Sequence, residues 1–411
     1  MKERGQFRTW IVLVLSALTV YSASDIFMPS ISHMAQDLGV SEAVATSNFS
    51  SYYLVLMISY ATVGPLCDSI SKKRLLLLSV GGCMLGCILC ASAHNMLMMN
   101  TGRGLQALAT GLVLLTTQVW IGSSSDRNNM LGRYAWFSLV TALAPVLAPA
   151  LGGLITDLLT WRYNFWFIAL LCVVAIIALA GTDVDRYGAT DSQRTAGSWK
   201  KYIRETAQGY WWALVHSPVE HFTLSLHGLF LGQGAFFALA SFLFVREFGV
   251  SAGTLGMMST IMVSGLLAGR FLTMYIRKRY TNRFAFMLNS SFVIASGVAM
   301  ICFRFITGSH NAVEVIAGMT LQAVGFSGLA ILSLNNCMLM AGERKGIISG
   351  MYNFMNQGAS LLGILLVQIL FGTGFNGIQI FQTIIYIVLL LAVTGTILFR
   401  RIYPKCKEVI E

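Results

Sequence analysis

The sequence predicts an all-α integral membrane protein in which twelve spanning helices form two six-helix bundles. Of its 411 residues, 56% are hydrophobic and only 11% are charged, whereas soluble domains carry about 25% charged residues. The apolar residues gather in runs of about 20, the length that an α-helix needs to cross a bilayer. A long polar stretch near the middle of the chain separates six of these runs from the other six.

Each predicted spanning helix is an apolar run bounded by charged or small polar residues. In the first half the runs cover residues 10–34, 43–63, 75–93, 97–120, 134–158 and 161–181. In the second half they cover residues 219–244, 252–275, 283–305, 312–338, 347–371 and 377–400. The first run follows a basic start, but it is too long for a cleaved signal peptide and contains a carboxylate, so we interpret it as a permanent helix.

The polar stretch at residues 182–218 is the longest in the chain and divides it near its midpoint. We therefore predict an N-terminal bundle at 1–181 and a C-terminal bundle with its tail at 219–411. From Ser198 onward the stretch combines tryptophan and tyrosine with lysine, which is typical of an amphipathic helix lying on a membrane surface. The sequence thus predicts a cytoplasmic linker between two bundles.

The basic residues predict the orientation of the helices. With the N-terminus in the cytoplasm, 23 of the 28 lysines and arginines fall on the inner side, as the positive-inside rule requires. Both termini are then cytoplasmic, in the inner membrane of a cell. The net charge of +11 is scattered over short segments, a pattern that favours anionic lipid headgroups and not nucleic acid.

Asp25 is the only carboxylate deep inside an apolar run, and an ionisable group at membrane depth indicates a functional site. Pro29 follows it and weakens the helix by removing a backbone donor. Arg103 is a lone charge in the fourth run. At 1.5 Å per residue, Asp25 lies about 22 Å and Arg103 about 21 Å from the inner face. We predict that the two residues form a proton-coupling pair; the alternative is a static ion pair that only braces two helices.

Other polar side chains within the apolar runs are candidates for a substrate cavity. Asn353 and Gln357 are spaced to share one helix face, and the 20 methionines of the chain suit a surface that adapts to varied apolar ligands. For any single amide, an interhelical hydrogen bond is the more common role. The predicted cavity residues are Tyr21, Asn48, Tyr52, Gln106, Gln233, Asn336, Asn353 and Gln357.

The loop between the second and third runs carries a carboxylate followed by a basic cluster. Asp68 lies at the inner end, where the eleventh run also begins, and helix N-termini attract anions. We therefore predict that Asp68 latches one half to the other; the alternative is a solvated turn whose lysines only follow the positive-inside rule. The predicted latch comprises Gly64, Asp68, Lys72, Lys73 and Arg74.

This loop resembles a signature of the major facilitator superfamily, with Ser69 and Ser71 in place of a basic residue and a glycine. The segment from Arg103 to Ala107 resembles the family's Arg-x-x-Gln-Gly signature, with Ala107 as the departure. The fifth run resembles the antiporter signature of this family through Pro145, Pro149, Gly152 and Gly153.

The segment from Asp25 to Ser30 resembles a stretch found in the bicyclomycin/chloramphenicol resistance branch of drug–proton antiporters. The Ala-Pro doublet at 144–149 and the Trp161-Arg162 pair also fit that branch. The resemblance covers nearly the whole chain. It implies the major facilitator fold, with two bundles related by pseudo-two-fold symmetry around a central cavity.

The resemblance further implies a proton-coupled antiporter that exports small amphipathic molecules, such as drugs or metabolites, by alternating access. A transporter of the same fold with a narrow substrate, such as a siderophore or an amino-acid derivative, stays open, for import or export. A passive channel or a membrane sensor is a remote alternative. The departures at Ser69, Ser71 and Ala107 leave room for a specialised member.

Several other chemistries find no support in the sequence. No Walker loop is present, and no nucleophile–base constellation indicates an enzyme. The cysteines at 83, 87 and 90 fit buried small residues, while the histidines at 216, 221 and 227 lack the further ligands of a zinc site. We therefore expect no metal and no cofactor, and a monomer whose partners are a small-molecule substrate, protons and the lipid bilayer.

Overall fold

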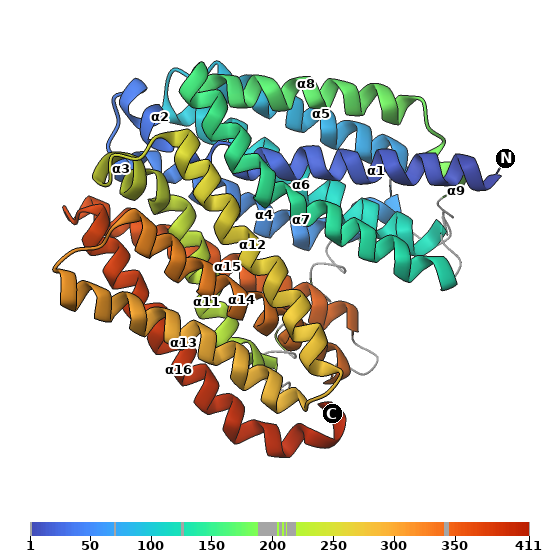
Figure 1. Ribbon diagram of the computed structural model, residues 1–411. Helices are drawn as coiled ribbons and strands as arrows, with labels where there is room; N and C mark the ends of the chain where they lie inside the picture. Colours follow the sequence, from blue (N-terminus) through green and yellow to red (C-terminus); the bar gives the residue numbers. More distant parts are fainter. Residues whose placement is uncertain are drawn as a thin grey trace. The chain divides into compact units, whose positions relative to one another are not determined.

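The computed structural model confirms the all-α class (Figure 1): the residues that it describes form helices and their connections, without a strand. It describes residues 2–69, 71–124, 127–187, 204, 208, 211, 219–340 and 345–410. Twelve helices in this part have 19 residues or more. Ten spans in the same part are long and apolar enough to cross a membrane.

Each of the twelve long helices overlaps one predicted run. In the first half they are α1 (Lys2–Asp25), α4 (Ser47–Ser69), α5 (Lys72–Ala91), α6 (Met96–Ser124), α7 (Arg127–Leu158) and α8 (Arg162–Ala180), with the short α2 (Ile31–Asp37), α3 (Glu42–Ala45) and α9 (Val184–Tyr187) between or after them. In the second half they are α11 (Val219–Ser241), α12 (Ala252–Arg277), α13 (Asn282–Thr307), α14 (Ala312–Met340), α15 (Lys345–Gly372) and α16 (Gly377–Ile410). A π-helix, η2 (Phe242–Glu247), extends α11.

The chain divides into two compact units, Met1–Ile203 and Arg204–Glu411. The division falls inside the predicted linker at 182–218. The first residues of that linker belong to the first half, because Trp120 donates a buried hydrogen bond from Nε1 to the Val184 carbonyl at 3.0 Å. Residues 188–203 and most of 205–218 lie outside the described residues, so the surface helix from Ser198 stays a prediction.

The first spanning run is not one helix, as the sequence analysis expected, but two helices joined by a tight turn. α1 ends at Asp25, a 3-10 turn, η1, covers Met28–Ser30, and α2 begins at Ile31. Pro29 occupies the start of the 3-10 turn, where its missing N–H costs nothing, whereas inside an α-helix it would leave a carbonyl unpaired. The turn is buried throughout, so other helices must hold it.

Small residues bring the helices of each bundle into close contact. In the first half, α1 packs against α6, α7 and α8, and in the second half α11 packs against α14, α15 and α16. At Gly234 of α11 a Cβ atom would lie 2.1 Å from the Ser360 carbonyl oxygen of α15. Backbones approach this closely only where one side chain is absent, which is the usual way in which membrane helices pack.

Candidate functional site

Asp25 is buried at the last residue of α1. The hydroxyl oxygen of Ser24 lies 2.7 Å from Asp25 Oδ1 and 2.7 Å from the Tyr21 carbonyl oxygen. A serine hydroxyl has a single proton and donates it to one acceptor at a time. The Ser24 hydroxyl therefore has two possible acceptors, the Tyr21 carbonyl and the Asp25 carboxyl group. Ser24 thus contacts the buried carboxyl group at the end of α1.

Arg103 is fully buried on α6, and its guanidinium holds the end of α1. Nη1 donates to the Ala23 carbonyl at 2.9 Å and to Gln106 Oε1 at 2.8 Å, and Nη2 lies 3.4 Å from the Ser24 carbonyl. The last carbonyls of a helix lack partners within it and carry partial negative charge. Arg103 thus caps the C-terminus of α1, while the ring of Tyr52 lies 4.4 Å below the guanidinium.

Asp25 and Arg103 form no ion pair in the part of the chain that the structure describes, although their charges interact. The static ion pair considered from the sequence is therefore absent between these two described residues. Instead the arginine binds the backbone that carries the acid. This arrangement leaves the carboxyl group within electrostatic reach of a cation that is held by other, neutral acceptors.

Two of the predicted cavity residues are tied into the bundle around Arg103. The Tyr52 hydroxyl donates to Thr110 Oγ1 at 3.1 Å, and Thr110 Oγ1 donates to the Gln106 carbonyl at 2.8 Å. Gln106 also donates from Nε2 to Cys87 Sγ at 3.1 Å. These contacts fix the side chains that surround the guanidinium, so they position Arg103 through its neighbours.

Asn48 and Tyr21 differ from these two cavity candidates. Asn48 is fully buried near the start of α4, and within the described residues neither its amide nitrogen nor its amide oxygen has a hydrogen-bond partner. A buried amide without partners costs about 1–3 kcal/mol. Tyr21 is half-buried one turn before Asp25. Of the first-half candidates, Asn48 is the one whose side-chain nitrogen and oxygen could both form hydrogen bonds with a further group.

The proline and glycine motif of α7 packs on the break between α1 and α2. A Cβ atom at Gly152 would lie 1.7 Å from the Ile26 carbonyl oxygen. One turn later, Thr156 and Ser30 share a hydrogen bond of 2.6 Å, and Asn164 of α8 donates to Thr156 at 2.9 Å and to Ser30 at 3.0 Å.

The other members of the motif lie inside the same helix. Pro145 and Pro149 are both within α7, the first half-buried and the second buried, and Gly153 is buried. α7 continues through both prolines, although each removes one backbone hydrogen bond. The motif therefore places a helix with weakened internal bonding directly beside the turn that follows Asp25.

The candidates of the second half do not gather around one another in the same way. Asn336 is buried and accepts a hydrogen bond from Asn282 of α13 at 2.6 Å, which is the interhelical role that the sequence analysis gave as the alternative to a cavity. On α15, Asn353 is exposed and Gln357 is half-buried, and Gln233 of α11 is half-buried. The structure describes each half by itself, so a cavity shared between the halves stays a prediction.

The basic cluster of the predicted latch opens α5. Ser71 is the N-cap residue and accepts from the Arg74 backbone at 3.2 Å. Lys72 is buried, Lys73 donates from Nζ to the Ala180 carbonyl at 2.9 Å, and Arg74 is exposed. Gly64 and Asp68 belong to α4, but the surroundings of the Asp68 side chain lie outside what the structure describes, so the latch itself stays a prediction.

Asp185 of α9 is a site residue that the sequence analysis missed. Its carboxylate accepts from Ser71 Oγ at 2.8 Å and from the Lys73 backbone nitrogen at 3.1 Å, so it binds the N-terminus of α5, where an anion is favourable. The residue lay in the predicted linker, and nothing in the sequence indicated that this segment returns to the first bundle.

Comparisons with known proteins agree with this architecture. The family model described as Major Facilitator Superfamily matches residues 13–364. The chain belongs to this superfamily. It is similar to Multidrug resistance protein D of Escherichia coli (strain K12), with 21% identity over 397 residues that cover 95% of this chain and 96% of that one.

Two further relatives have resistance names. Multidrug resistance protein MdtL of Klebsiella pneumoniae (strain 342) is 23% identical and the alignment covers 91% of this chain and 92% of that protein. Chloramphenicol resistance protein CraA of Acinetobacter baumannii is 28% identical over 169 residues, 41% of each chain. The predicted resemblance to the resistance transporters of the superfamily is thus confirmed, at low identity.

Solved structures show the same fold. The chain matches a peptide transporter POT with a TM-score of 0.77 and 14% identity, over 99% of this chain and 96% of that one. It matches the nucleoside transporter NupG with a TM-score of 0.73 and 14% identity, over 96% and 99%. At this identity the likeness carries the fold alone. The family match and the apolar helices together make the protein a multi-pass membrane transporter of the major facilitator superfamily.

Proposed function

We propose that the protein is a proton-coupled antiporter that exports small amphipathic molecules, such as drugs or metabolites, and that Asp25 binds the coupling proton. The observation that carries the proposal is the buried carboxyl group at the broken end of α1, beside an arginine that is bound to carbonyls and not to the acid. The names of the resistance relatives support the substrate class.

The coupling that we propose is an exchange of partners. When Asp25 is neutral, it does not attract the guanidinium, and Arg103 can stay on the carbonyls of Ala23 and Ser24. When Asp25 loses its proton, the carboxylate attracts the guanidinium, which can reach it only by weakening its hold on the end of α1. Proton occupancy is thereby linked to the geometry of the break.

The break transmits this change because α7 and α8 hold it. The Ile26 carbonyl touches Gly152, and Ser30 bonds to Thr156 and Asn164. A shift of the turn therefore moves against two helices of the same bundle. Alternating access uses such changes to tilt one bundle against the other, with the predicted latch at Asp68 biasing the balance between the inward- and outward-open states.

We further propose that the protein works as a monomer in the inner membrane, with both termini in the cytoplasm as its basic residues predict. The substrate cavity would be apolar and rich in methionine. In this proposal Tyr21, Asn48, Gln233, Asn353 and Gln357 supply its few polar anchors. Asn48 is the best supported of these, because both polar atoms of its buried side chain lack partners among the described residues.

Export of several compounds is the direct test of this function. Expression in an efflux-deficient bacterium should raise tolerance to several unrelated amphipathic compounds, and collapse of the proton gradient should remove that tolerance. A single endogenous metabolite accumulating outside the cells, without a drug phenotype, would instead establish the narrow-substrate transporter. Tolerance that persists without a proton gradient would contradict the coupling.

A further inference from the structure

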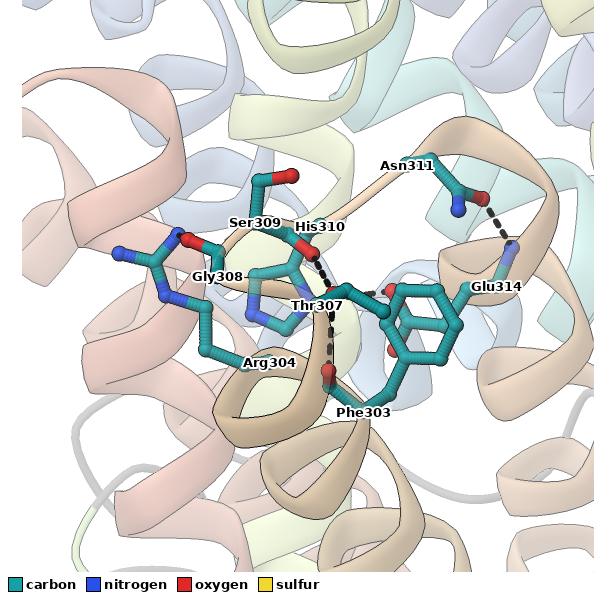
Figure 2. A network of polar contacts seen from close by, with 8 residues as sticks. All are labelled: Phe303, Arg304, Thr307, Gly308, Ser309, His310, Asn311 and Glu314. Atoms are coloured by element: carbon teal, nitrogen blue, oxygen red, sulfur yellow. Dashed lines mark hydrogen bonds and ion pairs between the residues drawn. The ribbon is translucent and has the colours of Figure 1, made fainter.

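The connection between α13 and α14 contains a buried pair of ionisable side chains that the transport mechanism does not use (Figure 2). His310 lies in the connection, and Glu314 lies in the first turn of α14. His310 Nδ1 and Glu314 Oε2 are 3.0 Å apart, and their side chains are only 1% and 10% exposed. The two side chains are therefore joined by a hydrogen bond that a single shared proton can form.

The pair is packed against a third helix. The imidazole of His310 meets the ring of Phe381 of α16 edge-on, with 5.3 Å between the ring centroids and 85° between their planes. The second carboxyl oxygen of Glu314, Oε1, is buried and has no hydrogen-bond partner in the described part of the chain. One oxygen of the carboxyl group is therefore open to a further ligand, and a proton is the smallest.

The connection around the pair is tightly bonded through its backbone. Gly308 adopts a positive φ of 78° and ends α13, which an L-residue with a side chain rarely does. Thr307 donates to the Ser309 carbonyl at 2.7 Å, and Asn311 Oδ1 accepts from the Glu314 backbone at 2.9 Å (Figure 2). The backbone of this turn is thus held by hydrogen bonds that do not depend on the contact between His310 and Glu314.

Few other charges face this end of the second half. α14 packs on α11, α12, α13, α15 and α16. At this end α13 contributes Arg304, which donates to the Gly308 carbonyl at 2.6 Å, and η2 contributes the exposed Arg246 and Glu247, with Glu247 accepting from the Gly377 backbone. The start of α12, the end of α15 and the start of α16 carry no charged residue. No other described group is seen to neutralise the pair directly.

We propose that His310 and Glu314 form a second proton-binding site, which holds the α13–α14 connection against α16 while one proton is bound. With one proton shared, the pair is neutral overall and joined by a charge-assisted hydrogen bond. Loss of that proton leaves a net negative charge in a buried site, which is costly. The connection therefore leaves its packing against Phe381 as the pH rises, so that the carboxylate reaches water.

The site is separate from Asp25, because it lies in the other unit of the chain. On the topology of the proposed function, this end of the second half faces outward, where protons enter. That direction rests on the proposed function, whereas binding of the proton to the pair does not. The pair would make the outer end of the second half respond to the pH outside, whichever substrate is carried.

Amide hydrogen exchange of the full-length protein in detergent tests the site directly. After correction for the intrinsic effect of pH, exchange of residues 303–318 should become severalfold faster from mildly acidic to alkaline pH, while the middle of α14 stays protected. Glu314→Gln and His310→Asn keep polar groups at these positions but cannot share a mobile proton. In both variants the exchange of this segment should lose its dependence on pH.

His94→Asn is the matched control, because His94 is an exposed histidine in a helix connection of the first half. It should leave the response of residues 303–318 unchanged. Exchange that is independent of pH in the unmodified protein, or a full response that persists in both Glu314→Gln and His310→Asn, would overturn the proposal. The measurement does not involve transport, so failure of the Asp25 mechanism would leave its outcome unaffected.

Discussion

Gly152 of α7 touches the carbonyl oxygen of Ile26, the residue directly after Asp25: a Cβ atom at position 152 would lie 1.7 Å from that oxygen. The contact joins the proline and glycine motif of the fifth spanning helix to the turn that carries the candidate proton site. The motif therefore has a local structural role, because only a glycine at position 152 lets the backbone of α7 approach the backbone at Ile26.

Gly152→Ala should therefore disturb the break without touching the carboxyl group. The added methyl group cannot fit, and overpacking of this kind costs about 1–3 kcal/mol. We expect a lower melting temperature in detergent and a large loss of transport. Gly82→Ala is the control, since a Cβ there meets nothing within 4 Å and alanine favours a helix. Equal stability and activity of the two variants would contradict the close packing.

Asp25→Asn should abolish transport driven by a pH gradient while the protein stays folded, because an amide cannot cycle a proton. Proton release on addition of substrate, measured in lightly buffered detergent solution, should vanish. Asp37→Asn removes a more exposed carboxylate that pairs with Arg162, and such pairs contribute about 0–1 kcal/mol, so it should keep the release. Release of normal size from Asp25→Asn would rule out this residue as the proton carrier.

Arg103→Ala should weaken both coupling and the end of α1. It leaves the Ala23 carbonyl without the partner it has at 2.9 Å, and a buried unpaired carbonyl costs about 1–3 kcal/mol. Arg103→Lys should restore only part of the transport, because an ammonium cannot reproduce the geometry of a guanidinium fork. Transport rates and melting temperatures of both variants test this expected partial rescue. Full activity with lysine would show that a positive charge alone suffices.

Asp68→Asn should slow turnover more than it weakens substrate binding, because the predicted latch biases the conformational balance and does not contact substrate. The available shift is a few kcal/mol at most. Distances between spin labels across the inner gate should show a larger inward-open fraction. Asp185→Asn is the comparison, since this residue binds the start of α5 within the first half. An unchanged distance distribution in Asp68→Asn would leave the solvated turn as its role.

Much of the fold was predictable because hydrophobic length is a strong signal in a membrane protein. The break at Pro29 was only partly predictable: the proline indicated a weak point, but the second helix depends on contacts from Gly152, Thr156 and Asn164, which are remote in sequence. The number of residues from each helix end predicted a similar membrane depth for Asp25 and Arg103. It does not predict in which direction each side chain points around its helix axis. The sequence therefore could not show that the arginine binds carbonyls.

Polar residues at helix ends were the least predictable part of the structure. Glu314 lies in the first turn of α14 and was not singled out from the sequence, yet its side chain is only 10% exposed. Asp185 lay in a polar stretch and was counted as linker. Asp185 is bound by the start of α5, which is remote in sequence, and Phe381 of α16 packs on His310, the partner of Glu314. A single sequence shows no sign of such contacts.

The breadth of the substrate range depends on how many polar anchors the cavity uses. If the cavity is apolar with few polar anchors, Asn353→Ala or Gln357→Ala should change which compounds are tolerated more than it lowers tolerance overall. A site built to hydrogen-bond one ligand behaves differently, because removal of one anchor leaves buried polar groups unpaired and function collapses. Resistance profiles of both variants against a panel of unrelated amphipathic compounds separate the two cases.

Asn336→Ala is the matched control for these profiles, because the Asn336 side chain is hydrogen-bonded to Asn282 within the second bundle. Loss of that buried hydrogen bond should lower stability by about 1–3 kcal/mol and reduce resistance to all compounds alike. A selective change of the profile in Asn336→Ala would place this residue in the cavity after all. Uniform loss in Asn353→Ala and Gln357→Ala would instead favour a single, narrowly recognised substrate.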